Sequence, residues 1–286
     1  MKTVKQVSAD FSEQLSTIYD VNEVNSLCMM VLENIVNISS ARIKAFPETE
    51  IPTPDNEIIA NILTRLATGE PIQYILGHTE FYGLTFKVNP SVLIPRPETE
   101  ELVDWIISSV GGSELAFGKF LDIGTGSGCI PISLKKNLRG AEVSAIDISP
   151  EALQTAKENA ELNKVDINFI QDDILNPESD ILNSKFEIII SNPPYVTLED
   201  KKLMQANVTD FEPHTALFVP EDDPLIFYKA IADFAANHLE KGGMLFFEIN
   251  ESYGKQIVEI LSDKIFTDIE LRKDMSGKDR MVKATK

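Results

Sequence analysis

The chain has 286 residues, of which 43% are hydrophobic and 25% are charged. This length and composition allow one large or two modest domains with a buried core, and they argue against global disorder. The formal net charge of −19, from 26 basic and 45 acidic residues, argues against broad binding to nucleic acid, because that binding depends on Lys and Arg at phosphates.

The chain lacks the sequence marks of secretion, of membrane insertion and of a metal centre. No apolar run reaches the length of a transmembrane helix, and the first ten residues lack the apolar core of a signal peptide. Cys28 and Cys129 do not suggest a disulfide framework, and the three histidines have no metal-ligand spacing. We therefore expect a cytoplasmic protein with no membrane partner and no metal site.

Residues 1–75 carry apolar side chains at helical spacing. The first stripe comprises Val4, Val7, Phe11, Leu15 and Ile18. Residues 24–35 and 58–66 repeat the pattern, which is typical of amphipathic helices. The sequence therefore predicts a small helical bundle as the first domain.

Residues 76–110 form a predicted linking segment. Residues 80–88 place aromatic and β-branched side chains on either side of a central glycine, which predicts a short hairpin. Residues 92–97 are expected to be extended, and a helix follows to about residue 110, before Gly111 breaks it.

Predicted strands and helices alternate through residues 111–286. The strands are expected at residues 120–123, 143–147, 167–171, 186–191, 244–249, 267–271 and 280–282. The helices are expected at residues 129–138, 150–163, 224–239 and 253–261. Such alternation is typical of an α/β domain with a doubly wound, mostly parallel, Rossmann-like sheet.

A glycine-rich loop joins the first of these strands to the first of these helices. It comprises Gly124, Thr125, Gly126, Ser127 and Gly128. Such a loop lets the chain turn sharply and lets a ligand approach the backbone. Asp147 ends the second strand, where an acid can accept both hydroxyls of a ribose, and Asp173 follows the third strand, where an acid can meet an adenine amino group.

Two cofactors fit this arrangement. A dinucleotide requires the spacing Gly-x-Gly-x-x-Gly, which places its pyrophosphate at a helix N-terminus. This chain has Gly-x-Gly-x-Gly preceded by Asp122, and an acid there suits the cationic S-adenosylmethionine, which has no pyrophosphate. The spacing favours S-adenosylmethionine, with a dinucleotide and a purely structural turn as the alternatives.

The tetrapeptide Asn192-Pro193-Pro194-Tyr195 follows the apolar strand expected at residues 186–191. Proline ends a strand because it has a fixed φ and no N–H, and the residue before it is held extended. The resulting corner carries an amide side chain, unpaired backbone carbonyls and an aromatic ring, which together can hold a planar NH2 group. An ordinary Asn-Pro turn is the alternative interpretation.

With the glycine loop, Asp147 and the tetrapeptide in this order, the chain resembles class I methyltransferases that act on a planar nitrogen. The tetrapeptide is shared with adenine-N6 and guanine-N2 methyltransferases, so it leaves the substrate open. The flanking segments closely resemble the HemK/PrmC family of peptide chain release factor glutamine methyltransferases. These segments are Tyr74-Ile75-Leu76-Gly77, Glu80-Phe81-Tyr82-Gly83, residues 93–100, Glu212-Pro213, Ala216-Leu217 and Gly277-Lys278-Asp279-Arg280.

The resemblance implies transfer of a methyl group from S-adenosylmethionine, with S-adenosylhomocysteine as product, to the glutamine side-chain amide in the Gly-Gly-Gln motif of class I peptide chain release factors. It implies that Asn192, Pro193, Pro194 and Tyr195 hold the glutamine, with Asn192, Pro193 and Tyr195 as the catalytic residues. It implies a cofactor site formed by Gly124, Thr125, Gly126, Ser127, Gly128, Asp147, Asp173, Ile174, Asn192, Pro95 and Arg96. The helical first domain would recognise the release factor, and no direct contact with nucleic acid is implied.

Two residues depart from the family pattern, and two competing functions stay open. Asn250 stands where the family usually has Gly, and Ile174 stands where some members have an aromatic residue beside the adenine. Arg96, between two prolines, has the alternative of pairing with Glu98 or Glu100 at the surface. The competing functions are a nucleic-acid adenine or guanine methyltransferase and a protein that binds S-adenosylmethionine without catalysis.

Overall fold

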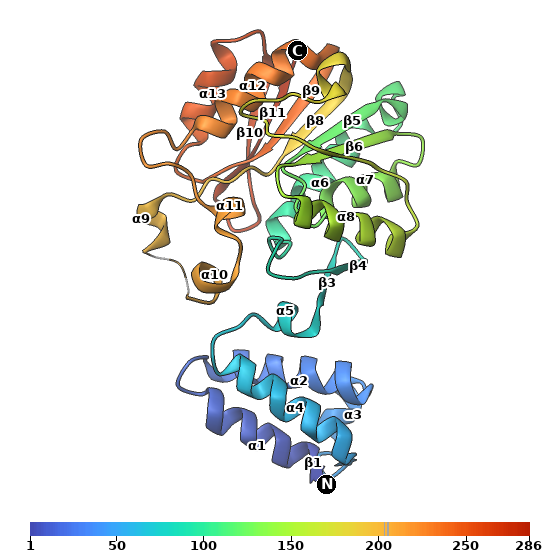
Figure 1. Cartoon of the computed structure of the whole chain (residues 1–286), viewed down its shortest axis with the longest axis vertical. Coiled ribbons are helices and arrows are strands. Elements are labelled where there is room, and N and C mark those ends of the chain that lie inside the picture. The colour runs from blue at the N-terminus through green and yellow to red at the C-terminus, as the bar shows by residue number, and fades with distance from the viewer. Residues whose placement is uncertain (203, 205) are drawn as a thin grey trace. The chain divides into compact units, whose positions relative to one another are not determined.

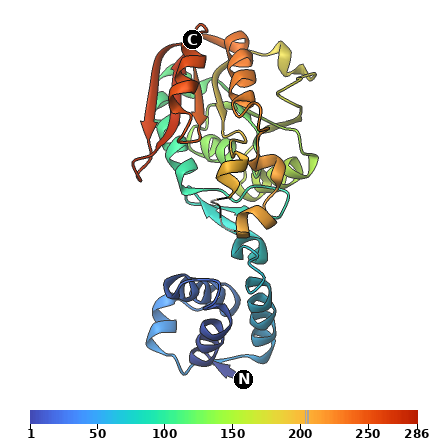
Figure 2. The same cartoon turned by 90° about the vertical axis from the view of Figure 1, so that its left-hand side faces the viewer.

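The computed structural model describes residues 1–202, 204 and 206–286, and these residues form two compact units. One unit comprises Met1–Leu76 and Ala206–Phe211, and the other comprises Gly77–Gln205 and Glu212–Lys286 (Figures 1 and 2). None of the described helices is both long enough and apolar enough to cross a membrane.

The smaller unit is built on three helices that pack around one apolar core. These are α1 (Val4–Leu15), α2 (Val21–Val36) and α4 (Thr53–Leu66). The shorter elements are β1 (Lys2–Thr3), α3 (Ser40–Ala45), β2 (Glu50–Ile51), α5 (Ile72–Leu76) and α10 (Ala206–Phe211). The side chains of Thr3 and Asp20 cap α1 and α2 by accepting hydrogen bonds from backbone N–H groups at the helix starts. The unit confirms the helical fold expected for the N-terminal part of the chain.

The apolar stripe predicted on the first helix is confirmed except at its end. The four apolar side chains of the stripe from Val4 to Leu15 are buried, whereas Ile18 lies beyond the helix and is 47% exposed. The backbone N–H groups of Ile18 and Tyr19 both donate to the carbonyl of Leu15, so the chain tightens there. The helical period therefore no longer carries Ile18 onto the apolar face.

The larger unit contains a seven-stranded sheet in the order β10-β11-β9-β8-β5-β6-β7 (Figure 1). The strands are β5 (Lys119–Ile123), β6 (Glu142–Asp147), β7 (Asn168–Gln171), β8 (Phe186–Ser191), β9 (Leu239–Glu248), β10 (Thr267–Lys273) and β11 (Asp279–Thr285). Strands β9, β8, β5, β6 and β7 are parallel, and β11 is antiparallel to both β9 and β10. This topology confirms the mostly parallel sheet expected from the sequence.

Helices cover both faces of the sheet. They are α6 (Pro97–Val110), α7 (Cys129–Asn137), α8 (Pro150–Asn163), α12 (Ile226–His238) and α13 (Gly254–Ser262). Side chains alternate between the faces, so Ile188 and Ile190 pack in the core with α6, α7 and α8, while Ile189 packs in the core with α12 and α13. A strand buried on both faces appears as a continuous apolar run, which is how β8 reads in the sequence.

The structure differs from the predicted elements where segments are short or irregular. The single-turn helices α9 (Leu198–Lys201), α11 (His214–Leu217), η1 (Glu114–Phe117) and η2 (Asp180–Asn183) have no counterpart in the prediction. One turn is too short to show a helical period. Strand β9 begins at Leu239 rather than at residue 244, and it passes Gly242, with φ of +81°, at an irregularity in its pairing with β8.

Strands β3 (His78–Phe81) and β4 (Leu84–Lys87) form the predicted hairpin. Tyr82 and Gly83 between them have φ of 49° and 71°, as a two-residue hairpin turn requires. The amide of Asn159 on α8 anchors the hairpin, because it accepts from the Lys87 N–H at 2.6 Å and donates to the Lys87 carbonyl at 3.0 Å. The same amide donates to the carbonyl of Ser127 at 2.9 Å, so the hairpin and the glycine loop share one anchor.

Candidate functional site

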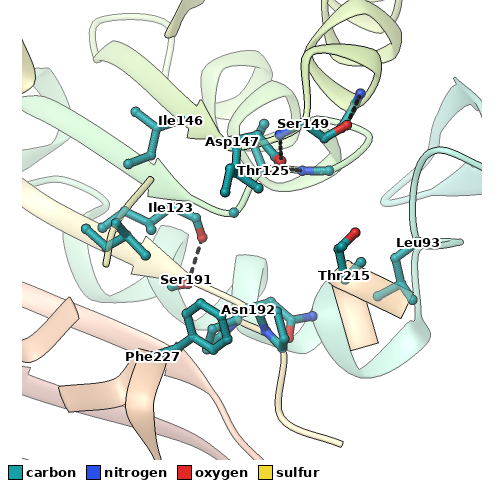
Figure 3. A pocket seen from close by; sticks show the side chains of 18 of the residues that line it. Leu93, Ile123, Thr125, Ile146, Asp147, Ser149, Ser191, Asn192, Thr215 and Phe227 are labelled. Atoms are coloured by element: carbon teal, nitrogen blue, oxygen red, sulfur yellow. Dashed lines mark hydrogen bonds between the residues drawn. The ribbon is translucent and has the colours of Figure 1, made fainter. Parts of the chain in front are cut away.

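A cavity of about 410 Å³ opens at the carboxyl ends of β5, β6 and β8 (Figure 3). Strands β6 and β8 flank β5 on opposite sides, and open α/β sheets bind ligands at such a switch in strand order. Figure 3 shows Asp147 and Ser149 on one side of the cavity and Asn192 and Phe227 on the other. The glycine loop and the proline corner, 64 or more residues apart in the chain, therefore face the same space.

Most of the predicted site residues line this cavity. They are Pro95, Arg96, Gly124, Thr125, Gly126, Ser127, Asp147, Asp173, Ile174, Asn192, Pro193 and Pro194. Gly128 is instead the N-cap of α7, and a Cβ there would meet the Ala156 Cβ of α8 at 3.1 Å. Its lack of a side chain serves the close packing of α7 on α8.

Asp147 ties the end of β6 to the glycine loop. Its Oδ2 accepts from the Gly126 N–H at 2.8 Å, and its Oδ1 accepts from the Ser149 N–H at 2.9 Å. Gly126 has φ of +54°, a conformation that favours glycine, and this turn aims its N–H at the carboxylate. Burial raises the pKa of Asp147, while these backbone hydrogen bonds oppose the shift. The carboxylate is thus held in place with lone pairs still able to accept hydroxyl groups of a ligand.

Asp122, just before the glycine loop, is a buried acid with little compensation. It is 1% exposed, and neither carboxylate oxygen has a hydrogen-bond partner among the described residues. Burial raises the pKa of Asp122 to about 7; the nearby Thr125 side chain opposes this rise, and the negative charge of Asp147 adds to it. A buried carboxylate left unpaired is costly, so a cation bound beside the loop would stabilise it.

Cys129, which begins α7, also lines the cavity. Burial raises the pKa of its thiol to about 12, and the charges of Asp122 and Glu248 contribute to the rise. The side chain therefore presents a neutral thiol to the cavity.

Asp173 and Ile174 follow β7 at the rim of the cavity. One oxygen of Asp173 accepts from the Leu175 N–H at 2.9 Å, which fixes the side chain in its loop. The preceding Asp172 is used structurally, because its carboxylate accepts from the hydroxyl of Ser179 at 2.5 Å. Asp173, rather than Asp172, is therefore the acid that structural contacts leave available to a ligand.

The segment containing Pro95 and Arg96 forms another wall. The Arg96 guanidinium pairs with Glu212 at 2.5 Å, and the other carboxylate oxygen of Glu212 accepts from the Ile94 N–H at 3.2 Å. The alternative pairing of Arg96 with Glu98 or Glu100 is therefore wrong. The reason is that the chain brings a buried carboxylate to Arg96 from 116 residues away, which no local pattern reveals.

The proline corner is held by the backbone on one side and by side chains on the other. The N–H groups of Tyr195 and Val196 both donate to the carbonyl of Leu217. The Asn192 amide nitrogen donates to the Thr99 hydroxyl at 3.4 Å, and the Tyr195 hydroxyl donates to Glu248 at 3.2 Å. Thr99 and Glu248 are site residues that the sequence did not single out, although Thr99 lies in a segment that carries the family resemblance.

Burial governs the protonation of the groups beneath the corner. It raises the pKa of Glu248, against hydrogen bonds from Thr99 and Tyr195 and the positive charge of Arg280. Burial, followed by the charge of Glu248, also raises the pKa of Tyr195 above its ordinary value, so this phenol stays protonated.

A second cavity, of about 340 Å³, lies on the other side of the corner. Asn192, Pro193 and Arg96 line both cavities, whereas Tyr195 lines only the second of the two. Polar and charged side chains complete the second cavity, namely those of Asp200, Asn250, Glu251, Ser252, Lys278 and Arg280. The corner therefore borders both a largely apolar cavity with a glycine loop and a more polar one.

Two family models match the chain. The model described as PrmC N-terminal domain matches residues 6–77, and the model described as Methyltransferase small domain matches residues 106–211.

The solved structures similar to this one show the same fold. A methyltransferase from Pyrococcus furiosus superposes with a TM-score of 0.52 at 17% identity, covering 79% of this chain and 98% of that one. The 16S rRNA N2 G1207 methyltransferase of Thermus thermophilus superposes with a TM-score of 0.53 at 20% identity, covering 73% of this chain and 49% of that one. The predicted class I methyltransferase fold is confirmed.

Full-length relatives are more similar in sequence. A protein of Flavobacterium psychrophilum named release factor glutamine methyltransferase is 46% identical, covering 98% of this chain and 98% of its own length. A protein of Bacteroides thetaiotaomicron with the same name is 41% identical, covering 99% of this chain and 100% of its own length. Because these similarities span both units, the chain belongs to the release factor glutamine methyltransferase family.

Proposed function

We propose that the chain transfers a methyl group from S-adenosylmethionine to the side-chain amide nitrogen of the glutamine in the Gly-Gly-Gln motif of class I peptide chain release factors. The family relationship supports this activity. The structural observation that carries the proposal is the corner Asn192-Pro193, which lines both cavities. A methyl donor on one side and an acceptor amide on the other would meet at this corner.

The first cavity suits S-adenosylmethionine. Asp147 would accept the ribose hydroxyls, the backbone from Gly124 to Ser127 would approach the amino-acid part, and Asp173 and Ile174 would border the adenine. The unpaired carboxylate of Asp122 fits a ligand that carries a sulfonium and an ammonium group. When bound, S-adenosylmethionine supplies a methyl group made electrophilic by the sulfonium charge.

The corner would hold the acceptor nitrogen by its hydrogens. The Asn192 Oδ1 would accept one N–H of the glutamine amide, and the Pro193 carbonyl would accept the other. These bonds fix the direction of the nitrogen, and holding reacting groups in place contributes several kcal/mol to catalysis. Two carbonyl oxygens beside the nitrogen also stabilise the positive charge that develops on it. A strong base is unnecessary, because an N-methylated cationic amide loses its proton readily to water.

Tyr195 would complete the second cavity as a neutral wall for the glutamine side chain. Its hydroxyl is engaged by Glu248 at 3.2 Å, so it is not available to take a proton from substrate. Tyr195 therefore acts through shape and contact with the substrate.

We assign recognition of the release factor to the helical N-terminal domain, residues 1–75, joined by residues 76–110 to the methyltransferase domain, residues 111–286. Glu48, Glu50 and Glu57 of the helical domain are exposed. They would favour a partner with basic residues, and the effect would appear mainly in the association rate and its dependence on salt. We place the reaction in the cytoplasm, without direct contact with nucleic acid.

Mass spectrometry tests the activity directly. The purified protein is incubated with S-adenosylmethionine and a class I release factor, and the peptide that contains the Gly-Gly-Gln motif is analysed. One added methyl group on the glutamine is expected, and a factor with Gly-Gly-Glu should stay unmodified. Methylation of DNA or RNA with no methylation of the factor would support the nucleic-acid alternative instead.

A further inference from the structure

A cluster of polar side chains at the proline corner has two buried members and two half-buried members. It consists of Glu248 at the end of β9, Thr99 in the first turn of α6, and Asn192 and Tyr195 of the corner, and we call it the Glu248 cluster. Glu248 is 1% exposed and Thr99 is 2% exposed, so water cannot substitute freely for a missing partner. Each hydrogen in the cluster therefore has to be accounted for.

When Glu248 is ionised, the donors and acceptors of the cluster allow one arrangement. An ionised carboxylate only accepts, and a hydroxyl has a single hydrogen to donate. Thr99 donates that hydrogen to Glu248 at 2.7 Å, and Tyr195 donates its own hydrogen to the other oxygen of Glu248 at 3.2 Å. The Thr99 oxygen can then only accept from Asn192, as it does from Nδ2 at 3.4 Å.

This arrangement favours one orientation of the Asn192 amide. The oxygen and the nitrogen of a side-chain amide lie on opposite sides of its end, so a nitrogen committed to Thr99 leaves Oδ1 for a partner outside the cluster. If the Thr99 hydrogen were free to turn toward Asn192, the amide could rotate and present its NH2 group instead. Glu248 opposes that rotation because it accepts the hydrogen of Thr99, which lies 149 positions away in the chain.

We propose that Thr99 and Glu248 are positioning residues that make the corner selective for an amide over a carboxylate, because they hold Asn192 with its carbonyl oxygen toward the acceptor. This inference rests on the proposed function. Glutamine offers two N–H donors to the oxygens of Asn192 and Pro193. Glutamate offers only oxygens, which those carbonyls repel.

Hydrogen bonds and a nearby cation oppose the rise that burial imposes on the pKa of Glu248. Arg280 of β11 faces it and is held by Asp274 at 3.3 Å and by the Ile249 carbonyl at 3.3 Å. The Tyr228 hydroxyl donates to the backbone carbonyl of Glu248 at 3.3 Å, which leaves the carboxylate oxygens to Thr99 and Tyr195. A neighbouring cation with its own fixed partners supplies charge balance without adding a competing donor to the carboxylate.

The test compares Thr99→Val, which removes the hydroxyl at nearly constant shape, with Thr99→Ser, which keeps it. For each variant, kcat is measured on a release factor with Gly-Gly-Gln, and the inhibition constant is measured for the same factor with Gly-Gly-Glu. We expect Thr99→Val to lower kcat by about tenfold, less than the roughly 10²–10³-fold cost of losing the contact itself, because Asn192 is misaligned rather than removed. We also expect it to tighten inhibition by the Gly-Gly-Glu factor, because the Asn192 NH2 group can then face the carboxylate. Thr99→Ser should restore both values toward those of the wild type.

Glu248→Gln provides an independent arm, since it can donate to Thr99 and so release the Thr99 hydrogen toward Asn192. It should shift the same two measurements in the same direction, and the double variant with Thr99→Val should be less impaired than the two single effects combined. If Thr99→Val fails to fold, Glu248→Gln still tests the proposal.

Unchanged discrimination between the two factors in folded Thr99→Val or Glu248→Gln protein would overturn the proposal, as would equal impairment of Thr99→Val and Thr99→Ser. Failure of the proposed function is a different result. It would appear in the wild-type protein, as absence of glutamine methylation, before any variant is compared.

Discussion

Asp122 and Glu248 are both buried acids near the proposed reaction centre, but their surroundings satisfy them to different degrees. Each is 1% exposed. Glu248 accepts from two hydroxyl groups and faces Arg280, whereas Asp122 has no hydrogen-bond partner among the described residues. The region beneath the corner is thus complete in itself, while the region beneath the glycine loop lacks a positive partner. A site that binds one ligand for its charge and orients another for reaction needs both kinds of region.

The largest effect on turnover is expected from replacing Asn192, the residue that Thr99 and Glu248 orient. We expect Asn192→Ala to lower turnover by about 10²–10³-fold, because one aligned acceptor at the developing charge is lost. Affinity for S-adenosylmethionine should stay close to that of the wild type, since the glycine loop and Asp147 are untouched. Single-turnover methylation and calorimetry measure the two quantities separately. Near wild-type turnover in this variant would show that the corner does not hold the acceptor.

In the region of the glycine loop, replacing Asp147 should affect the binding of S-adenosylmethionine more than turnover. Asp147→Ala removes a charged acceptor from the ribose hydroxyls, a loss of roughly 1.5–3 kcal/mol, or about one to two decades in cofactor affinity. It also leaves the N–H groups of Gly126 and Ser149 without their partner. Calorimetry with S-adenosylmethionine gives the affinity, and Asp147→Asn, which keeps an acceptor, is the matched control. Equal affinity in all three proteins would remove Asp147 from the site.

The missing partner of Asp122 predicts a pH-dependent stability. Its pKa in the folded protein is raised to about 7 from 3.8, so the stability linked to its protonated form is present at acid pH and is lost as the pH rises through about 7. Asp122→Asn cannot ionise, and its Tm advantage over the wild type without cofactor should grow between about pH 4 and about pH 7 and level off above that range.

The same variant tests whether the cofactor supplies the missing charge. We expect S-adenosylmethionine to raise the Tm of Asp122→Asn less than that of the wild type at neutral pH, because ligand stabilisation scales with affinity. Parallel Tm profiles across pH, with equal ligand-induced shifts, would contradict the idea that Asp122 awaits a cation.

The smallest effect on turnover is expected from replacing Asn250. Its amide donates to the Tyr195 carbonyl at 3.1 Å and to Asp200 at 2.9 Å, which ties the corner to α9. Asn250→Gly introduces the residue expected from the family resemblance and should cost about 2 kcal/mol of stability, because two hydrogen bonds of roughly 1 kcal/mol each are lost. Turnover should change little, because Thr99, Glu248 and Leu217 still hold the corner. Thermal unfolding measures the stability change and steady-state kinetics measures turnover. A large fall in kcat would mean that the Glu248 cluster cannot hold the corner in place without Asn250.

Local sequence patterns were enough to predict the central sheet and to place the glycine loop and the proline corner at its edge. The apolar run of β8 ends at two prolines, and the glycine loop follows β5 directly, so each motif could be placed from its immediate neighbours. The switch in strand order then brings both to the same cavity. The alternation that fixed the α/β class depends on long, regular elements, which are the ones that periodicity reveals.

The parts that sequence reasoning missed depend on residues far apart in the chain. Glu212 meets Arg96 across 116 positions, and Glu248 meets Thr99 across 149 positions. In the sequence these are ordinary acids among many, and only folding shows that they are buried. The same limit explains why Arg96 has a surface alternative in the sequence, although the structure gives it a buried partner.

Cys129 bears on the selectivity of the reaction for its proper acceptor. A thiolate is intrinsically a far better methyl acceptor than a carboxamide, and Cys129 lines the cavity assigned to the methyl donor. Only the thiolate form is strongly nucleophilic, and burial holds the pKa of this thiol at about 12, so the reactive form is nearly absent at neutral pH. The apolar packing around Cys129 would thus also protect the protein from alkylating itself, and would leave the weak nucleophile that we propose at the corner as the group that reacts.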